Sequence, residues 1–250
     1  MPHLQVLRAG FAPVKGTAHR SFDEVRLSPG GVVGDRRYAL IARHGGAARV
    51  LKTVQHPELV TVHAACRGTE LEVRLPGGEL LRATPTPTGE RVTADFWGRP
   101  ARMQILGPDF DEAFSDLVGA PVRLAATAPR EVVYGGTVSI VGSASLAALA
   151  DRVQEPVAAA RFRANLVVAT DVPFVEESWR GRLARIGSAV VRIDGSIPRC
   201  AVIDIDPRDG ARGTHLLKEL TVFRPCNARG EPAFGVFAEV IEPGSWRAGR

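Results

Sequence analysis

The residue with the clearest chemical capacity is Cys200, which directly follows Arg199 at the head of an alternating apolar run. A thiolate is a soft metal ligand and a nucleophile, and a neighbouring guanidinium favours the ionised sulfur. The pair could therefore ligate a metal or carry a sulfur atom. The alternative is a buried apolar side chain, which is the commoner role of a free cysteine.

Five further short sequence motifs occur before and after this pair, in a fixed order. They are Ala-Pro-Val-Lys-Gly at 12–16, Gly-Asp-Arg-Arg-Tyr at 34–38, Phe-Arg-Ala-Asn-Leu-Val-Val at 162–168, Phe-Gly-Val-Phe-Ala-Glu-Val at 234–240 and Glu-Pro-Gly at 242–244. In this order and spacing they resemble the MOSC-domain proteins, whose fold is named after the C-terminal part of molybdenum cofactor sulfurases. The resemblance covers nearly the whole chain and includes the N-terminal β-rich partner domain of that family.

The resemblance implies a molybdenum cofactor (Mo-molybdopterin), in which the metal is held by the dithiolene of a phosphorylated pterin and by one cysteine of the protein. Cys200 matches that cysteine, and Arg199 matches an arginine directly before it. The dithiolene and oxo ligands leave a position for a soft thiolate, and the phosphate requires several donors. Basic residues from distant parts of the chain should therefore converge on the cofactor.

Six further positions match residues that bind the cofactor in the family: Lys15, Arg36, Thr137, Ser139, Arg163 and Asn165. Arg36 could bind a phosphate or pterin oxygen in bidentate fashion, and Asn165 offers the paired donor and acceptor that a pterin edge can use. Thr137 and Ser139 would present backbone and hydroxyl contacts. The alternatives are solvated surface charges, an asparagine bonded to nearby backbone, and ordinary strand residues.

Four positions depart from the family pattern: Gly16 (usually serine), Ala164 (usually proline), Ile197 (often a second cysteine) and Phe237 (a tyrosine). Losing a second cysteine removes a possible persulfide relay but leaves the metal ligand. The other changes alter the polarity of the predicted pocket rather than its ability to bind a metal.

The elements that must position these residues are mostly strands. Residues 4–101 form short alternating runs broken by Gly and Pro, which is typical of a β-rich domain. A helix is predicted over 109–118, ending at Gly119. We place a domain junction near residue 125, with the N-terminal β-rich domain over 1–125 and the MOSC domain over 126–250. The predicted fold class is mostly β with helices (α+β), and the resemblance implies a β-barrel in the second half.

Within the second half, the pattern predicts strands at 138–141, 166–169, 189–193, 200–205 and 234–241. Ser143 is expected to cap a helix through about Val153, and Thr214 a helix through about Thr221. Asp204 and Asp206 would lie on one face of the strand that begins at Cys200, which suits proton delivery to a substrate. A solvated or turn-capping pair is the alternative.

Composition limits the partners. The chain has 250 residues, 45% of them hydrophobic, and a formal net charge of +5, which suits an anionic ligand. Aromatic residues make up only 6%, and no Lys/Arg run exceeds two residues, so we expect no nucleic-acid partner. The three cysteines are widely spaced without a Cys-x-x-Cys pair, which indicates no zinc or disulfide framework and favours a reducing compartment. Neither a signal-like N-terminus nor an apolar run of about 20 residues is evident, so we expect a cytoplasmic protein without a membrane partner.

Together, these features favour a molybdenum-dependent oxidoreductase similar to the amidoxime-reducing members of the family. Such an enzyme reduces an N-hydroxylated small-molecule substrate to an amine or amidine plus water. The sequence has neither a Cys-rich ferredoxin module nor a flavin signature, so the electrons would come from a separate reductase. The alternative is a non-catalytic carrier that holds the cofactor, or a sulfur atom on Cys200, for delivery. The pyridoxal-phosphate chemistry of sulfurases belongs to an aminotransferase-like part to which no segment of this sequence corresponds.

Overall fold

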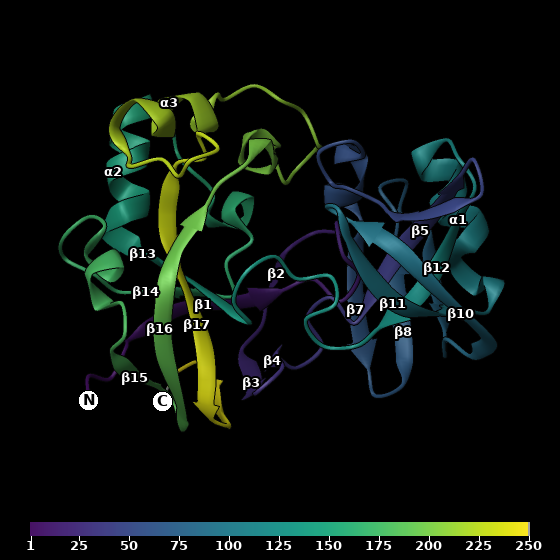
Figure 1. The fold of residues 1–250 in the computed structure, drawn as a ribbon, viewed down its shortest axis with the longest axis horizontal. Helices are drawn as coiled ribbons and strands as arrows, with labels where there is room; N and C mark the ends of the chain where they lie inside the picture. Colours follow the sequence, from purple (N-terminus) through teal and green to yellow (C-terminus); the bar gives the residue numbers. More distant parts are fainter. Residues whose placement is uncertain (250) are drawn as a thin grey trace.

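The structure is a computed structural model that describes residues 1–249, and it confirms the predicted fold class: mostly β with three α-helices. Two β-rich units lie side by side in Figure 1, the first half of the chain mainly on the right and the second half on the left. The helices are α1 (Asp111–Val118), α2 (Ser143–Val153) and α3 (Leu216–Phe223), with short 3-10 turns η1 (Pro57–Thr61), η2 (Pro108–Phe110), η3 (Ala159–Phe162), η4 (Val175–Trp179) and η5 (Ala201–Asp204).

The first unit is built on a closed five-stranded barrel. Its strands are β10 (Pro87–Phe96), β11 (Arg99–Leu106), β12 (Val122–Thr127), β5 (Tyr38–His44) and β6 (Ala47–Val50). A separate three-stranded sheet contains β7 (His63–Arg67), β8 (Glu70–Arg74) and β9 (Leu80–Ala83). Side chains alternate across a strand, so the two faces of β5 enter different cores: Ala39 and Ile41 pack in one, and Tyr38 and Leu40 in the other.

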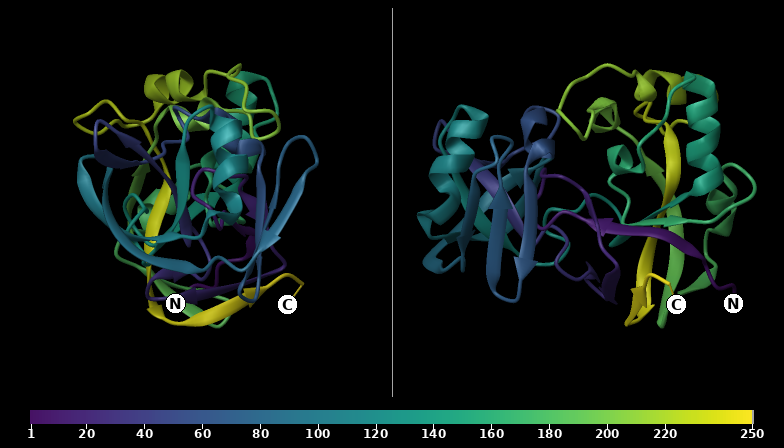
Figure 2. Two further views of the ribbon diagram at one scale, coloured as in Figure 1. Left: turned by 90° about the vertical axis from the view of Figure 1, so that its right-hand side faces the viewer. Right: turned by 180° about the vertical axis from the view of Figure 1, so that it is seen from behind.

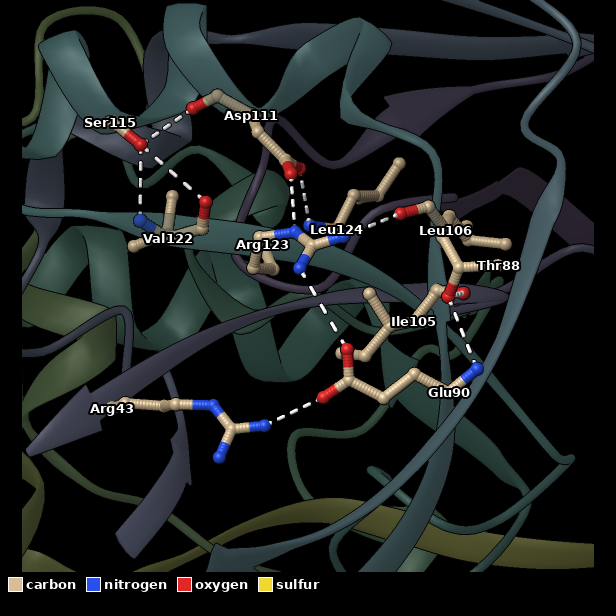
Figure 3. A network of polar contacts seen from close by, with 10 residues as sticks. All are labelled: Arg43, Thr88, Glu90, Ile105, Leu106, Asp111, Ser115, Val122, Arg123 and Leu124. Atoms are coloured by element: carbon tan, nitrogen blue, oxygen red, sulfur yellow. Dashed lines mark hydrogen bonds and ion pairs between the residues drawn. The ribbon is translucent and has the colours of Figure 1, made fainter. Parts of the chain in front are cut away.

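Helix α1 is attached to the barrel by a polar network, which Figure 3 shows at close range. Asp111 accepts hydrogen bonds from the backbone N–H of Leu124 at 2.8 Å and from Nε of Arg123 at 2.6 Å. The hydroxyl of Ser115 accepts a bond from the N–H of Val122 at 3.0 Å. Gly119 ends the helix with φ +69°, as its position after the apolar periodicity predicts.

The second unit is a seven-stranded sheet curled into a half-barrel. Its order is β15 (Leu183–Ile186), β16 (Ala189–Pro198), β17 (Ala233–Glu242), β13 (Val138–Gly142), β14 (Leu166–Val168), β1 (Val6–Phe11) and β2 (Arg20–Ser21). A smaller sheet orders β18 (Gly244–Arg247), β3 (Glu24–Ser28) and β4 (Gly31–Val32). A further apolar core, which includes Leu149, Leu216 and Leu220, joins α2 and α3 to this unit.

The beginning of the chain therefore belongs to the sheet of the second unit. Strand β1 pairs with β14, with Arg8 opposite Val167 and Ala9 opposite Leu166. Seen from behind in Figure 2, purple β1 runs from the second unit toward the barrel. The chain thus enters the second unit first, crosses to the barrel and returns. The junction near residue 125 stays a prediction, since these sheets are not divided along the sequence at one point.

Four local predictions are wrong: one strand, one shared strand face and two helix caps. Residues 200–205 are not a strand: β16 ends at Pro198, and η5 follows Cys200. The ladder stops there because its partner β17 begins at Ala233, opposite Pro198. Asp204 and Asp206 consequently do not share a strand face.

The caps also differ. Ser143 lies inside α2, where its hydroxyl exchanges hydrogen bonds with the backbone of Thr170. The hydroxyl of Thr214 donates to Glu155, and the carboxylate of Asp204 accepts the N–H of Leu217 in the first turn of α3. Local sequence did not reveal these partners, because each comes from an element remote in the chain.

Candidate functional site

A cavity of about 330 Å³ lies between the barrel and the seven-stranded sheet, and both units line it. Cys200 is part of its wall, at the turn between β16 and η5. The Cys200 side chain is exposed rather than packed among aliphatic neighbours. The alternative of a buried structural cysteine is therefore wrong, and the sulfur is free to meet a ligand.

Lys15 and Arg36 reach the cavity from segments that flank the barrel. Lys15 Nζ donates to the carbonyl oxygen of Leu51 at 2.9 Å and lies 5.2 Å from the ring centroid of Phe96. Arg36 adopts a left-handed backbone with φ +48° and forms an ion pair with Asp35. Both cations are therefore held by the protein before any ligand arrives.

Arg163 and Arg199 approach from the second unit. Arg199 Nε donates to the carbonyl of Phe234 at 2.8 Å, and its Nη1 donates to that of Phe162 at 2.9 Å. The Nη2 atoms of Arg163 and Arg199 are both buried without a hydrogen-bond partner among the residues described. Leaving a charged donor unpaired is costly, so these atoms point to a ligand that would supply the missing acceptors.

The pKa values of the cations reflect this crowding. Burial lowers the pKa of Lys15 to about 7, and repulsion from Arg36 and Arg163 adds to this, while Cys200 opposes it. Burial, followed by repulsion from Arg36, lowers the pKa of Arg163 to about 10. Burial likewise lowers the pKa of Arg199 to about 10, with Cys200 acting in the opposite direction. Positive charge thus exceeds negative charge around the cavity, and an anionic ligand would relieve the repulsion.

The donor set fits a molybdenum cofactor of the phosphorylated dithiolene type. Within residues 1–249, no group of three His, Cys, Asp or Glu side chains is placed to hold a metal ion. A metal at Cys200 would therefore take most of its ligands from its own organic cofactor, as a dithiolene provides. Lys15, Arg36 and Arg163 supply cations for the phosphate, and the unpaired arginine donors remain for ring oxygens.

Asn165 and Ser139 line the cavity, but their polar groups are already used. Asn165 Oδ1 accepts from the backbone N–H and hydroxyl of Ser139 at 3.1 and 2.9 Å. Its Nδ2 donates to the carbonyl of Gly10 at 3.3 Å and to Asp35 at 3.1 Å. An amide has two donors and two acceptor positions, so these contacts exhaust it. Asn165 therefore links Ser139, Gly10 and Asp35 through hydrogen bonds and stabilises the cavity wall.

Thr137 does not line the cavity. Its side chain is buried, and its hydroxyl donates to the carbonyl of Ala238 at 3.4 Å. Asp206 is likewise engaged elsewhere, in ion pairs with Arg161 at 2.8 Å and Arg208 at 2.9 Å. Those contacts, Arg208 first, lower the pKa of Asp206 to about 2, so it stays ionised near neutral pH and does not deliver protons.

Sequence reasoning missed several residues of the cavity wall: Lys52, Thr53, Phe96, Trp97, Tyr134, Arg161, Arg229 and Glu231. One of these residues could have been noticed in the sequence. In Asp-Phe-Trp-Gly at 95–98, a tryptophan occupies a position at which hairpin turns favour small or polar residues. The others come from loops whose position depends on tertiary contacts.

Two departures from the family pattern lie in tightly packed parts of the structure. Gly16 has φ +97°, a conformation in which a serine would be strained, and an added Cβ would lie 3.1 Å from Leu59. Phe237 packs tightly on the backbone of Gly135 and Gly136, where an added Cβ would lie 2.3 and 2.6 Å from the Phe237 side chain. Gly136 and Phe237 therefore line the cavity together, and Gly135 packs against the same ring.

The depressed pKa of Lys15 makes a pH-dependent prediction. Between pH 7 and 10.5 the unfolded chain binds more protons than the folded one, so the free energy of unfolding rises with pH in this window. We expect Lys15→Met to raise the free energy of unfolding at pH 7 by about 2 to 4 kcal/mol and to flatten this rise. Urea denaturation of metal-free protein at several pH values measures both effects.

Lys218→Met is the matched control, because Lys218 is exposed on α3 and does not line the cavity. This control should keep the pH dependence of the original protein. Parallel curves for Lys15→Met and the unaltered protein would contradict the burial of an unfavourable charge at Lys15.

Two family models match the chain. Residues 6–121 match the family model of the MOSC N-terminal beta barrel domain, and residues 130–250 match that of the MOSC domain. Molybdenum cofactor sulfurase of Danio rerio is 24% identical over 266 residues, covering 90% of this chain and 30% of that protein. The chain thus spans less than a third of that relative.

A second curated relative is similar over more of its own length. Mitochondrial amidoxime-reducing component 1 of Homo sapiens is 26% identical over 247 residues, covering 86% of this chain and 71% of that protein. Among solved structures, the YuaD protein of Bacillus subtilis aligns over 98% of this chain and 91% of its own, at 14% identity and a TM-score of 0.45. Across residues 1–249, none of the helices has the length and apolar character needed to cross a bilayer.

Proposed function

Because the chain belongs to the proteins that join a MOSC N-terminal beta barrel domain to a MOSC domain, we propose that it binds a molybdenum cofactor and reduces N-hydroxylated compounds. The observation that carries the proposal is the exposed sulfur of Cys200 in a cavity whose nearby cations, Lys15, Arg36 and Arg163, outnumber the carboxylate of Asp35 that pairs with Arg36. Similarity to an amidoxime-reducing component supports the reaction class.

Cys200 is the metal ligand in this proposal, and the arginine and lysine side chains hold the phosphorylated pterin. Arg199 holds the turn that carries Cys200, since its guanidinium bridges the carbonyls of Phe162 and Phe234. Three segments that are remote in the sequence are thereby fixed around the sulfur.

When bound, the cofactor supplies the two-electron redox chemistry that removes oxygen from the substrate. The overall change consumes two electrons and two protons and converts an N-hydroxyl group to N–H with release of water. A phosphate bound beside Lys15 would raise the pKa of Lys15 above its ligand-free value of about 7, so Nζ stays charged and binds the anion. The electrons come from a separate reductase.

The test is to express the full chain with cofactor supply, measure molybdenum per chain, and assay reduction of benzamidoxime with an artificial electron donor. We expect about one molybdenum per chain and formation of benzamidine. Metal-free protein under these conditions would contradict cofactor binding, and loaded protein without turnover would contradict the reductase role.

A carrier role is the second candidate, and the exposure of Cys200 favours it, because a delivered group must be reachable. Similarity to the molybdenum cofactor sulfurase is also compatible with it. Loaded protein that never reduces benzamidoxime, yet transfers its cofactor or a persulfide to an acceptor enzyme, would establish this role instead.

A further inference from the structure

The rim of the cavity carries two large aromatic side chains that the roles above do not use. Trp97 and Tyr134 both line the cavity, and each is 47% exposed. Single exposed aromatic residues are common on protein surfaces, so exposure alone carries no conclusion. The way in which these two are held is what distinguishes them.

Trp97 occupies a backbone conformation that its side chain disfavours. It forms the turn between β10 and β11 with φ +57°, and Gly98 follows with φ +80°. Turns with positive φ at both central residues favour Asn, Asp and Gly, and a bulky residue there costs about 1 to 3 kcal/mol. The hairpin tolerates this because Asp95 Oδ1 accepts the N–H of Gly98 at 2.9 Å. Lys52 Nζ lies 4.3 Å from the ring centroid of Trp97 and restrains the ring from one side.

Arg99 ties the segment of Tyr134 to the same hairpin. Its guanidinium donates to the carbonyl of Val133, the residue before Tyr134, and lies 4.9 Å from the ring centroid of Phe96. The carboxylate of Glu131 accepts the backbone N–H of Arg102 at 2.9 Å. Segment 131–134 is thus attached to β11 beside the turn, and the two aromatic residues lie on rim segments that are held together.

We infer that Trp97 and Tyr134 determine substrate specificity by holding a planar aromatic substrate at the mouth that leads to Cys200. Stacking on an indole or phenol ring is worth about 0.5 to 1.5 kcal/mol beyond the area buried. Lysine and arginine side chains outnumber the carboxylate of Glu231 among the residues that line the cavity, so a neutral or anionic ring is accepted better than a cationic one. This inference rests on the proposed reductase function, whose reaction it narrows to aromatic N-hydroxylated compounds.

The test compares two probes that carry the same reactive group, benzamidoxime with a phenyl ring and acetamidoxime with a methyl group. In molybdenum-loaded protein, Trp97→Asn suits the left-handed turn and removes the ring, so the fold should persist. We expect it to raise KM for benzamidoxime about fivefold and to leave KM for acetamidoxime within about twofold. Trp97→Phe should retain most of the preference, and Tyr134→Ala should resemble Trp97→Asn. Equal changes for both probes would overturn the inference.

Tryptophan fluorescence gives a second readout, independent of turnover. Benzamidoxime should quench the fluorescence of the unaltered protein, Trp97→Phe should abolish the quenching, and Trp179→Phe should retain it, because Trp179 packs against the core of the second unit. Quenching that survives Trp97→Phe would overturn the inference. If the loaded protein reduces neither probe, the reductase proposal fails, whereas quenching that depends on Trp97 would still support the aromatic rim.

Discussion

We expect Cys200→Ser to abolish molybdenum retention, with the metal content of the purified protein falling at least tenfold. A serine hydroxyl stays protonated near neutral pH and is a weaker donor than a thiolate, so it should bind this metal much less tightly. The Cys200 side chain is exposed, so the substitution creates no buried void. Elemental analysis of the protein after gel filtration measures the loss, and an unchanged thermal midpoint shows that the fold is intact.

Cys226→Ser is the matched control for this experiment. Cys226 is also exposed, but it does not line the cavity, so its replacement should leave molybdenum content unchanged. Retention of metal in Cys200→Ser would remove Cys200 as the ligand. Loss of metal in both variants would indicate that general thiol chemistry, rather than the cavity, retains it.

The second large effect concerns stability rather than cofactor binding. We expect Asn165→Ala to lower the free energy of unfolding by about 3 kcal/mol or more. The substitution leaves buried partners on Gly10, Asp35 and Ser139 without their hydrogen bonds, and each unsatisfied group costs roughly 1 to 3 kcal/mol. Urea denaturation of metal-free protein measures the change.

Two further variants test the structural role of Asn165. Ser139→Ala removes the hydroxyl that donates to Asn165 Oδ1 and accepts the backbone N–H of Asn165, and it should cost about 1 to 2 kcal/mol. Asn165→Asp keeps the shape but sets a carboxylate against Asp35, which raises the pKa of the new carboxyl. Its destabilisation should therefore be largest near neutral pH and diminish as the pH falls through that raised value. If Asn165→Ala lowered the free energy of unfolding by less than about 1 kcal/mol, the structural role of Asn165 would be contradicted.

The elements that could be predicted from the sequence are those whose signals are local. Helix α1 could be predicted because acidic residues and apolar spacing lie within it and Gly119 follows it directly. The strand predicted from Cys200 failed because alternation of apolar residues does not show whether a partner strand is present. The structure places Ile203 in the core shared with α2 and α3, while β17 ends its pairing with β16 before that point.

The predicted site divides in the same way. Its cations could be named from the sequence, but not which of the matched residues remain available to a ligand. The polar groups of Asn165 are fully engaged by the protein, Thr137 does not line the cavity, and the aromatic residue Trp97 on the rim was not part of the prediction. Whether a matched side chain is available to a ligand depends on its hydrogen bonds to other segments. Some of these segments are more than a hundred residues away in the chain, as Gly10 is from Asn165.

By itself, the sequence determined that this protein is a β-rich chain with one cysteine directly after an arginine, Cys200, and several short motifs with basic residues around it. Only the tertiary structure shows that residues from these motifs line one cavity. Pairing of β1 with β14 brings the beginning of the chain into the sheet of the second unit, and the following segment carries Lys15 to the same cavity as Cys200. Such long-range pairing depends on the packing of the whole chain, which no local pattern of residues encodes.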